Sequence, residues 1–357
     1  MRKLILALIL LFGIGFIAAS MQEMEETLVS LRAGNWRFIG LAALVEGLWL
    51  LNIGASYKVI YEIVGLKETR RRLIFLSTAA NFISVITPAA GGVPAIAVFL
   101  NDANHRGHAK GRVLVAWTIN LLFDYVGLLV VVTLGLVVML RRNNLHVAGI
   151  LAFLILLVIA VGIAVLLYLG TRSPATLAKV LAWMAQRVNR VYWFFTHRPY
   201  LNVERAYSFA EDAAEGMLAL RSQPGRLWQP LVLALTNKAL LVTILMLIFL
   251  AFNTPFSSGT LIGGFGISYV FVIVSPTPSG IGIVEGVLAL TLRSLGVPLG
   301  AATLITISFR GLTFWLPLVI GLFTLREVSK GSRSLPEVLN ETLEPPLEPE
   351  RVINPRE

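Results

Sequence analysis

The chain has 357 residues, of which 56% are hydrophobic and only 14% are charged. Soluble globular domains carry about 25% charged residues, so this composition, with a mean hydropathy of +0.78, predicts a multi-spanning membrane protein. The chain has no cysteine, which excludes disulfides and cysteine-ligated metal centres. Its net charge of +10 does not indicate nucleic-acid binding, because the basic residues cluster in the loops between apolar segments.

The first apolar segment, residues 1–20, opens with Arg2 and Lys3 and ends in small residues. It is either the first span or a cleaved signal peptide, and both interpretations leave the residues that follow on the outer side. A span needs about 20 apolar residues to cross about 30 Å of hydrocarbon. By this criterion five more full spans are predicted, over 38–57, 113–140, 147–169, 229–252 and 301–325.

Two further apolar regions are interrupted by prolines and glycines. Residues 73–87 and 95–100 flank the stretch TPAAGGVP, and residues 260–274 and 281–292 flank SPTPSGIG. Short arms around such a break are typical of re-entrant hairpins, which enter and leave the membrane on the same side. Kinked full spans are the alternative, and they would make eight hydrophobic segments in all. The break positions are Thr87, Pro88, Gly91, Gly92, Ser275, Pro276, Pro278, Gly280 and Gly282.

The lysines and arginines orient the predicted spans. With the N-terminus in the cytoplasm, 19 of the 26 basic residues in 1–326 lie on the cytoplasmic side and five lie outside. The C-terminus is then also cytoplasmic, and we expect the protein in the cell's inner membrane. The two hairpins enter from opposite faces, so the halves 36–140 and 228–326 form an inverted repeat, a plan typical of transporters. The predicted fold class is therefore an all-α integral membrane protein with six full spans and two re-entrant hairpins.

The halves are joined by residues 171–227, which we expect in the cytoplasm. Apolar residues at helical spacing, with basic residues on another face, predict an amphipathic helix in this linker. The helix either binds anionic inner-leaflet lipids over 171–195 or packs on the bundle. Residues 1–326 form the membrane domain, and the Pro/Glu-rich residues 327–357 predict a disordered tail.

Five charged residues stand inside apolar segments. Each costs about 2.5–3.5 kcal/mol at the bilayer centre on insertion scales, so each needs a partner or a wet cavity. They either form salt bridges that lock the halves together or line a path for a charged lipid headgroup. In the path, arginine and the helix N-termini after the breaks would suit a phosphate, and the acids would suit an amine or hold the arginine in place. The five residues are Glu46, Asp124, Lys238, Glu285 and Arg310.

The sequence has none of the enzyme motifs that carry common catalytic chemistry. It has no GxxxxGK[ST] phosphate loop, no HExxH and no GxSxG. We therefore expect no enzyme activity, no ATP-driven step, no cofactor and no metal site. His105 and His108 are interpreted as members of a solvated basic loop.

The stretch SPTPSGIGIVEG (275–286), followed by SFRGLTFWLPLVIGL (308–322), resembles the flippase-type transmembrane domain of lysylphosphatidylglycerol synthetases, the multiple peptide resistance factor family. The resemblance covers about residues 1–326 and is looser in the first half, where TPAAGGVP and LLFDYVG follow the family's outline. It implies a bundle with paired re-entrant hairpins that moves an aminoacylated phospholipid between leaflets. The motif positions that it implies are Pro276, Pro278, Gly280, Gly282, Glu285 and Arg310, with Asp124 as the acid of the first half.

The chain departs from the family pattern in three respects, of which one is that the first-half motif continues into apolar AIAVFL, where we expect charged residues. Ser279 stands at the place of a second glycine, and there is no soluble aminoacyl-transfer domain, so we do not expect the chain to make aminoacyl lipid itself. The leading hypothesis is a flippase-like or scramblase-like transporter of a phospholipid or a polyprenyl-phosphate lipid. Two others stay open: a scaffold or accessory subunit for an envelope-lipid or glycan-modifying enzyme, and an ion-coupled transporter of small solutes.

Overall fold

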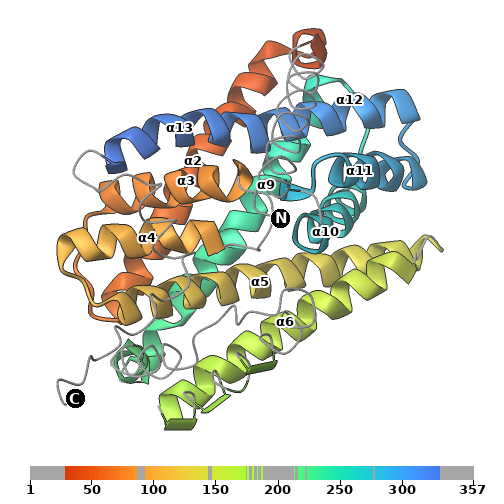
Figure 1. The fold of residues 1–357 in the computed structure, drawn as a ribbon. Coiled ribbons are helices and arrows are strands. Elements are labelled where there is room, and N and C mark those ends of the chain that lie inside the picture. The colour runs from red at the N-terminus through yellow and green to blue at the C-terminus, as the bar shows by residue number, and fades with distance from the viewer. Residues whose placement is uncertain are drawn as a thin grey trace, which may run out of the picture.

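The computed structural model describes residues 29–329, apart from 87–92, 144–146, 276–277 and most of 174–222. Every regular element among these residues is a helix, and none of them forms a strand. The long helices α5, α6 and the rod of α12 and α13 run along the bundle, and α2 and α9 cross obliquely behind them (Figure 1). The predicted amphipathic linker lies largely, and the C-terminal tail almost wholly, outside the described residues.

Five helical stretches in the described residues are long and apolar enough to cross a membrane, so the protein is a multi-pass membrane protein. They coincide with the five spans predicted after residue 20, whereas the predicted span 1–20 lies outside the described residues. The last stretch contains a short π-helix that the sequence did not predict. The helices concerned are α2 (Trp36–Ile63), α5 (Lys110–Arg141), α6 (Val147–Arg172), α9 (Trp228–Ala251) and the α12–α13 rod (Leu299–Arg310 and Leu316–Ser329).

Four shorter helices pack as two pairs, each pair around one of the Pro/Gly breaks. Helices α3 (Arg70–Ile86) and α4 (Val93–Arg106) occupy one half of the bundle, and α10 (Ser258–Val274) and α11 (Ile283–Ser294) occupy the other (Figure 1). None exceeds 17 residues, which is short of the roughly 20 that a span needs. These dimensions agree with hairpins, and the face from which each enters the membrane stays a prediction.

Helix α4 is longer than the apolar run 95–100 predicted, because its polar continuation is held by ion pairs. Arg72 of α3 donates from Nε to Asp102 Oδ1 at 3.0 Å, and Arg106 lies 3.2 Å from Glu68 Oε2. His108 Nε2 lies 3.4 Å from the same Glu68 oxygen, so its ring belongs to this cluster and not to a fully solvated loop. The cluster fastens α3 to α4 at the end of the bundle that lies away from the break.

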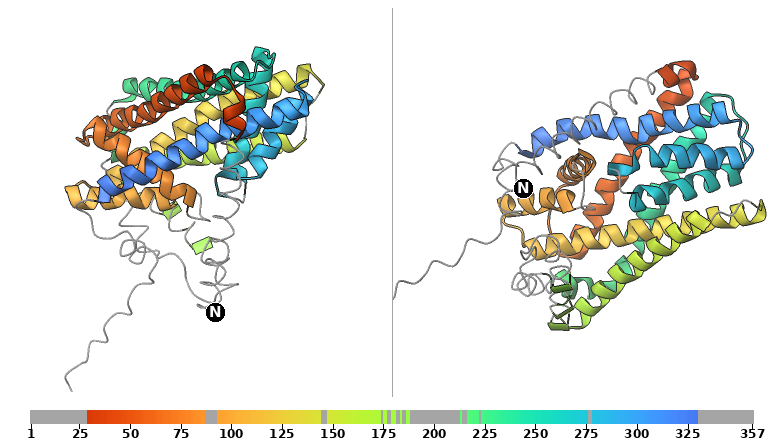
Figure 2. Two further views of the ribbon diagram at one scale, coloured as in Figure 1. Left: turned by 90° about the horizontal axis from the view of Figure 1, so that it is seen from above. Right: turned by 45° about the vertical axis from the view of Figure 1, so that its right-hand side comes forward.

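Helices α2 and α9 pack antiparallel along their length and lie side by side in both further views (Figure 2). At one end Asn35 N donates to Ala251 O at 2.9 Å. Nearer the other end Trp49 Nε1 donates to Asn237 Oδ1 at 3.0 Å. This pairing brings residues 46–49 of α2 to the depth of residues 237–240 of α9, so the central charges of the two helices lie at a similar depth.

Two other pairs of helices approach closely through glycine. A side chain at Gly266 of α10 would meet the carbonyl oxygen of Val131 in α5 at 2.9 Å. A side chain at Gly321 of α13 would meet Cβ of Phe82 in α3 at 2.6 Å. Small residues let helices pack backbone to backbone in a membrane, where burial of apolar side chains supplies little driving force. Each short pair is thereby held against a long helix of the other half.

Candidate functional site

The second Pro/Gly break is a turn of left-handed residues between two helices. Helix α10 ends at Val274, residues 278–280 form a single 3₁₀ turn, and α11 begins at Ile283. Ser279, Gly280 and Gly282 have φ of 50°, 74° and 79°. A side chain at Gly280 would also meet Val284 Cγ2 at 2.3 Å. Pro276 and the first-break residues Thr87, Pro88, Gly91 and Gly92 lie outside the described residues.

We expect Ser279→Gly to stabilise the protein by about 1 kcal/mol, because the left-handed conformation costs an L-residue roughly that much and glycine nothing. Thermal unfolding of the purified protein in detergent measures the change. Asn253→Gly is the matched control, since Asn253 has a similar φ of 48° but asparagine tolerates this region better. A Ser279→Gly protein that melts at or below the native temperature would contradict the prediction.

Arg310, the last residue of α12, ties this break to the bundle. Its Nε donates to Glu285 Oε1 at 2.5 Å, and its Nη2 donates to the carbonyl oxygen of Ser279 at 3.1 Å. The guanidinium also lies 4.9 Å from the ring centre of Phe314. Only 8% of the residue is exposed. One arginine therefore joins the break, the start of α11 and the aromatic residue that follows α12.

The chain changes helix type directly after Arg310. Residues Gly311–Trp315 form a π-helix, and α13 resumes at Leu316. Pro317 stands just beyond and has no amide hydrogen to donate to the preceding turn. Single π-helical turns inside α-helices often mark functional sites. Sequence reasoning missed this turn, and Pro317 was the available signal for it.

Glu285 lies in the first turn of α11, where the partial positive charge of the helix N-terminus favours a carboxylate. An external anion at this helix end would therefore meet a resident negative charge, contrary to the expectation that the break simply favours anions. The second carboxylate oxygen, Oε2, is buried and has no hydrogen-bond partner among the described residues. It remains available as an acceptor.

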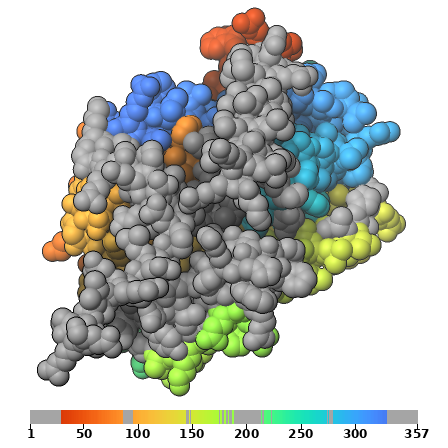
Figure 3. Space-filling model, viewed as in Figure 1, coloured from red at the N-terminus to blue at the C-terminus, as the bar shows by residue number. Residues whose placement is uncertain are grey.

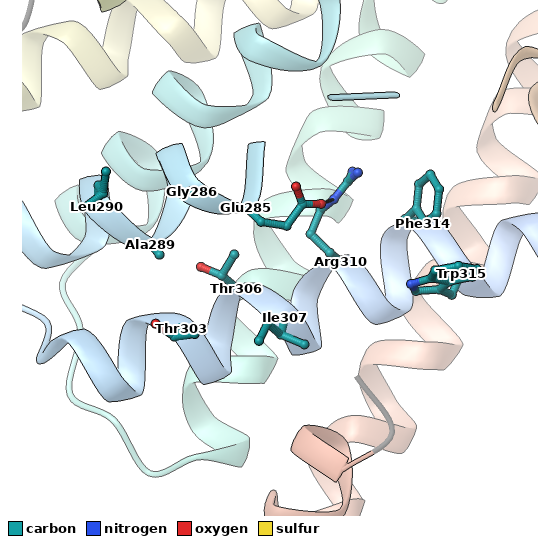
Figure 4. A pocket seen from close by; sticks show the side chains of 10 residues that line it. All are labelled: Glu285, Gly286, Ala289, Leu290, Thr303, Thr306, Ile307, Arg310, Phe314 and Trp315. Carbon is teal, nitrogen blue, oxygen red and sulfur yellow. Dashed lines mark hydrogen bonds and ion pairs between the residues drawn. The ribbon is translucent and has the colours of Figure 1, made fainter. Parts of the chain in front are cut away.

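A partly open pocket of about 380 Å³ lies between α11 and α12, with Glu285 and Arg310 among its lining residues. In Figure 4 the Glu285 carboxylate points towards the Arg310 guanidinium, and Leu290 and Trp315 lie at opposite ends of the view. The Thr306 hydroxyl, from a residue only 1% exposed, has no partner among the described residues. Atoms of α11 and α12 form part of the surface of the bundle (Figure 3).

A second ion pair connects the halves. Lys238 Nζ of α9 donates to Asp124 Oδ1 of α5 at 2.6 Å. The lysine side chain is 2% exposed and the aspartate side chain 37%. The ring centre of Tyr269 in α10 lies 5.2 Å from the same ammonium group. Asp124 thus partners Lys238, whereas Glu285 holds Arg310; the sequence left both acids as candidates for that arginine.

Tyr269 is a member of this region that sequence reasoning missed. Its electrostatic surroundings include Asp124, Arg310 and Glu46, and its ring packs on Phe265 at 4.8 Å between centres. A tyrosine within an apolar helix gives no distinct signal, since aromatic residues are common in such segments. Only the packing of α10 against its neighbours reveals that it lies among the charges.

Glu46, the remaining charged residue, forms no ion pair with another described residue. It is 0% exposed, and neither carboxylate oxygen has a hydrogen-bond partner among the described residues. The five residues therefore divide into two pairs and one unpaired acid. In the described part of the chain no group of three or more acidic or histidine side chains could hold a metal ion.

Comparison with known proteins identifies the family. The model of a family described as the lysylphosphatidylglycerol synthase TM region matches residues 4–321, nearly the whole chain. This match confirms the resemblance inferred from the motifs around the second break. No curated protein matches the chain in sequence.

Proposed function

Since the chain belongs to the lysylphosphatidylglycerol synthase TM region family, we propose that it moves a lipid between membrane leaflets as a flippase-like or scramblase-like transporter. The headgroup enters the pocket between α11 and α12. The observation that carries this proposal is a largely buried pair of opposite charges, Glu285 and Arg310, which lines the pocket between α11 and α12. Such a pocket suits a polar headgroup attached to apolar chains.

The hydrogen-bonding state of the pocket favours one headgroup chemistry. Glu285 Oε2 and the Thr306 hydroxyl are buried without partners among the described residues, whereas the Arg310 guanidinium already contacts Glu285, Ser279 and Phe314. Buried acceptors without donors are costly, so a headgroup with an ammonium or hydroxyl group would gain most. We therefore propose an amine-bearing phospholipid as the substrate in preference to a polyprenyl phosphate. The phosphate of the latter offers mainly hydrogen-bond acceptors, and to bind Arg310 it would have to separate that residue from Glu285.

We propose that the second ion pair continues the path. Asp124 and Lys238 lie on the long helices α5 and α9, and Tyr269 has both Asp124 and Arg310 in its electrostatic surroundings. A phosphate passing this region would be attracted by Lys238 and an amine by Asp124. The two pairs therefore offer both signs of charge to a zwitterionic headgroup at successive positions.

We also propose the inverted repeat and the re-entrant hairpins as the architecture of transport. Their support is the antiparallel packing of α2 on α9 and the short arms around both breaks. The glycine contact of α10 with α5 has a counterpart in the contact of α13 with α3. Opposed broken helices near the midplane suit alternating access. The same proposal includes three further expectations: the positive-inside orientation, the inner-membrane location and the binding of anionic lipids by residues 171–195.

Transport in liposomes tests the function. Purified protein reconstituted with a fluorescent aminoacylated phospholipid should speed its movement between leaflets, followed by quenching of the outer leaflet. Glu285→Gln should slow the movement about tenfold or more, because a hydrogen bond to a charged group is worth about 1.5–3 kcal/mol. Glu62→Gln, which alters an exposed ion pair at the end of α2, is the control and should leave the rate unchanged.

Two outcomes would count against the proposal. If the native protein does not speed lipid movement, the transporter hypothesis fails. Stable co-purification with an envelope-lipid enzyme would then favour the scaffold. If native transport is robust and Glu285→Gln transports equally well, the function stands and the pocket assignment is wrong.

A further inference from the structure

Of the five charged residues inside apolar segments, Glu46 is the one that the path above does not use. It lies near the middle of α2 and is 0% exposed. Both carboxylate oxygens are buried without a hydrogen-bond partner among the described residues. It does not line the pocket between α11 and α12. A carboxylate in this position has no contact with bulk solvent and no donor among the described residues to stabilise its charge.

In the described part of the chain, the two cations near the middle of the helices around Glu46 are already paired. Helix α2 packs against α9, α3, α5 and the π-helical turn, and also touches α13. On α9, Lys238 is committed to Asp124 of α5. Arg310, next to the π-helical turn, is committed to Glu285.

The other polar groups described near Glu46 do not supply a counter-charge. Tyr269 of α10 is an uncharged phenol that lies within electrostatic reach of Glu46. Asn237 of α9 accepts a hydrogen bond from Trp49, one turn from Glu46. The basic residues of α3 and α13 lie at their terminal turns, Arg70 to Arg72 and Arg326.

An ionised Glu46 would be expensive in this conformation. The effective cost of burying an uncompensated charge is several kcal/mol, and the neutral acid avoids most of it. Ionisation therefore requires a different arrangement, in which water or a cation reaches the contact between α2 and α9. A ligand that binds one conformation better than another shifts the balance between them, and here that ligand is a proton.

We propose that Glu46 is a proton-binding site that couples protonation to the packing of α2 against α9. Uptake forms an O–H bond on the carboxylate from a proton of the surrounding water, and release returns that proton to water, with no other reactant. The neutral acid stabilises the packed arrangement, and the carboxylate favours an opened one. This inference extends the proposed function, because it gives the protein a means to respond to a proton gradient. Its supporting observations concern Glu46 and do not depend on the proposed headgroup pocket.

Infrared difference spectroscopy of the purified protein in lipid nanodiscs tests the site without any transport measurement. Shifting the pH from acid to alkaline, in buffer without sodium, should remove the C=O stretching band of a buried protonated carboxylic acid. The band should be lost in Glu46→Gln, which keeps shape and neutrality, and in Glu46→Met, which keeps approximate volume. It should persist in Glu62→Gln, whose carboxylate is partly exposed at the end of the same helix.

Hydrogen exchange tests the coupling. As the pH rises through the range in which the infrared band disappears, backbone amides of α2 and α9 should exchange faster. The increase should exceed the base-catalysed rise in intrinsic exchange rate. In Glu46→Gln the protection should stay constant. A band that survives in Glu46→Gln, or one that sodium abolishes at constant pH, overturns the proton site. Equal loss of protection in native protein and Glu46→Gln overturns the coupling.

Discussion

Asp124→Asn is expected to lower the free energy of unfolding by about 3–5 kcal/mol, the usual cost of leaving a buried charge without its partner. The charge left behind is Lys238, whose side chain is 2% exposed. Lys238→Met should cost less than Asp124→Asn, because the abandoned Asp124 is 37% exposed, whereas the Lys238 left behind in Asp124→Asn is 2% exposed and bears the larger desolvation penalty. The difference in stability between the two variants follows from the difference in burial between Lys238 and Asp124. Unfolding of each variant in detergent with increasing denaturant measures its free energy of unfolding.

The double variant Asp124→Asn/Lys238→Met is the matched control for this pair. Replacing both members removes the charges together, and such replacements are often neutral. It should therefore recover most of the stability lost in Asp124→Asn. Equal destabilisation by the two single variants would contradict the asymmetry expected from burial. A double variant as unstable as Asp124→Asn would show that the loss does not come from an unpaired Lys238.

Arg310→Ala is the second change with a large expected effect, and it should affect both stability and transport. It removes the partner of Glu285, which is 20% exposed, so we expect about 3 kcal/mol of destabilisation, the low end of the range for buried pairs. It also frees the carbonyl oxygen of Ser279 and leaves Phe314 without its cation. Lipid movement should fall to the rate of protein-free liposomes, because the break, α11 and the π-helical turn lose their common anchor.

Arg226→Ala controls for the loss of an arginine in an ion pair. Arg226 lies 3.0 Å from Glu62 at the end of the bundle, and both side chains are about 40% exposed. Exposed pairs contribute about 0–1 kcal/mol, so this variant should melt and transport like the native protein. An Arg310→Ala protein with native transport would remove Arg310 from the headgroup path. One with native stability would show that its ion pair is not structurally important.

The two ion pairs have different relations to the proposed path. The pair of Glu285 and Arg310 lies within one half of the chain and lines the pocket. The pair of Asp124 and Lys238 joins one half to the other. The salt-bridge interpretation and the path interpretation are therefore compatible, since a headgroup can exchange partners with a pair that also holds two helices together.

Much of the fold was predictable because membrane spans depend on local composition. A run of about 20 apolar residues has few alternatives to a helix, since every backbone polar group in the hydrocarbon must be satisfied internally. The five spans after residue 20 accordingly appear where the sequence placed them. The polar end of α4 was missed, because Asp102 and Arg106 find partners in Arg72 and Glu68 only after α3 and α4 have packed.

The sequence by itself determined the membrane class, the positions of five spans and the interruption after Val274, and its motifs indicated the family that the whole-chain match established. These features depend on hydropathy, on proline and glycine, and on short motifs, all of which are local. Only the tertiary structure decided that Arg310 pairs with Glu285, that Lys238 pairs with Asp124 and that Glu46 has no partner among the described residues. The physical reason is that an ion pair depends on distances of a few ångströms between residues far apart in the chain, and those distances exist only once the helices have packed.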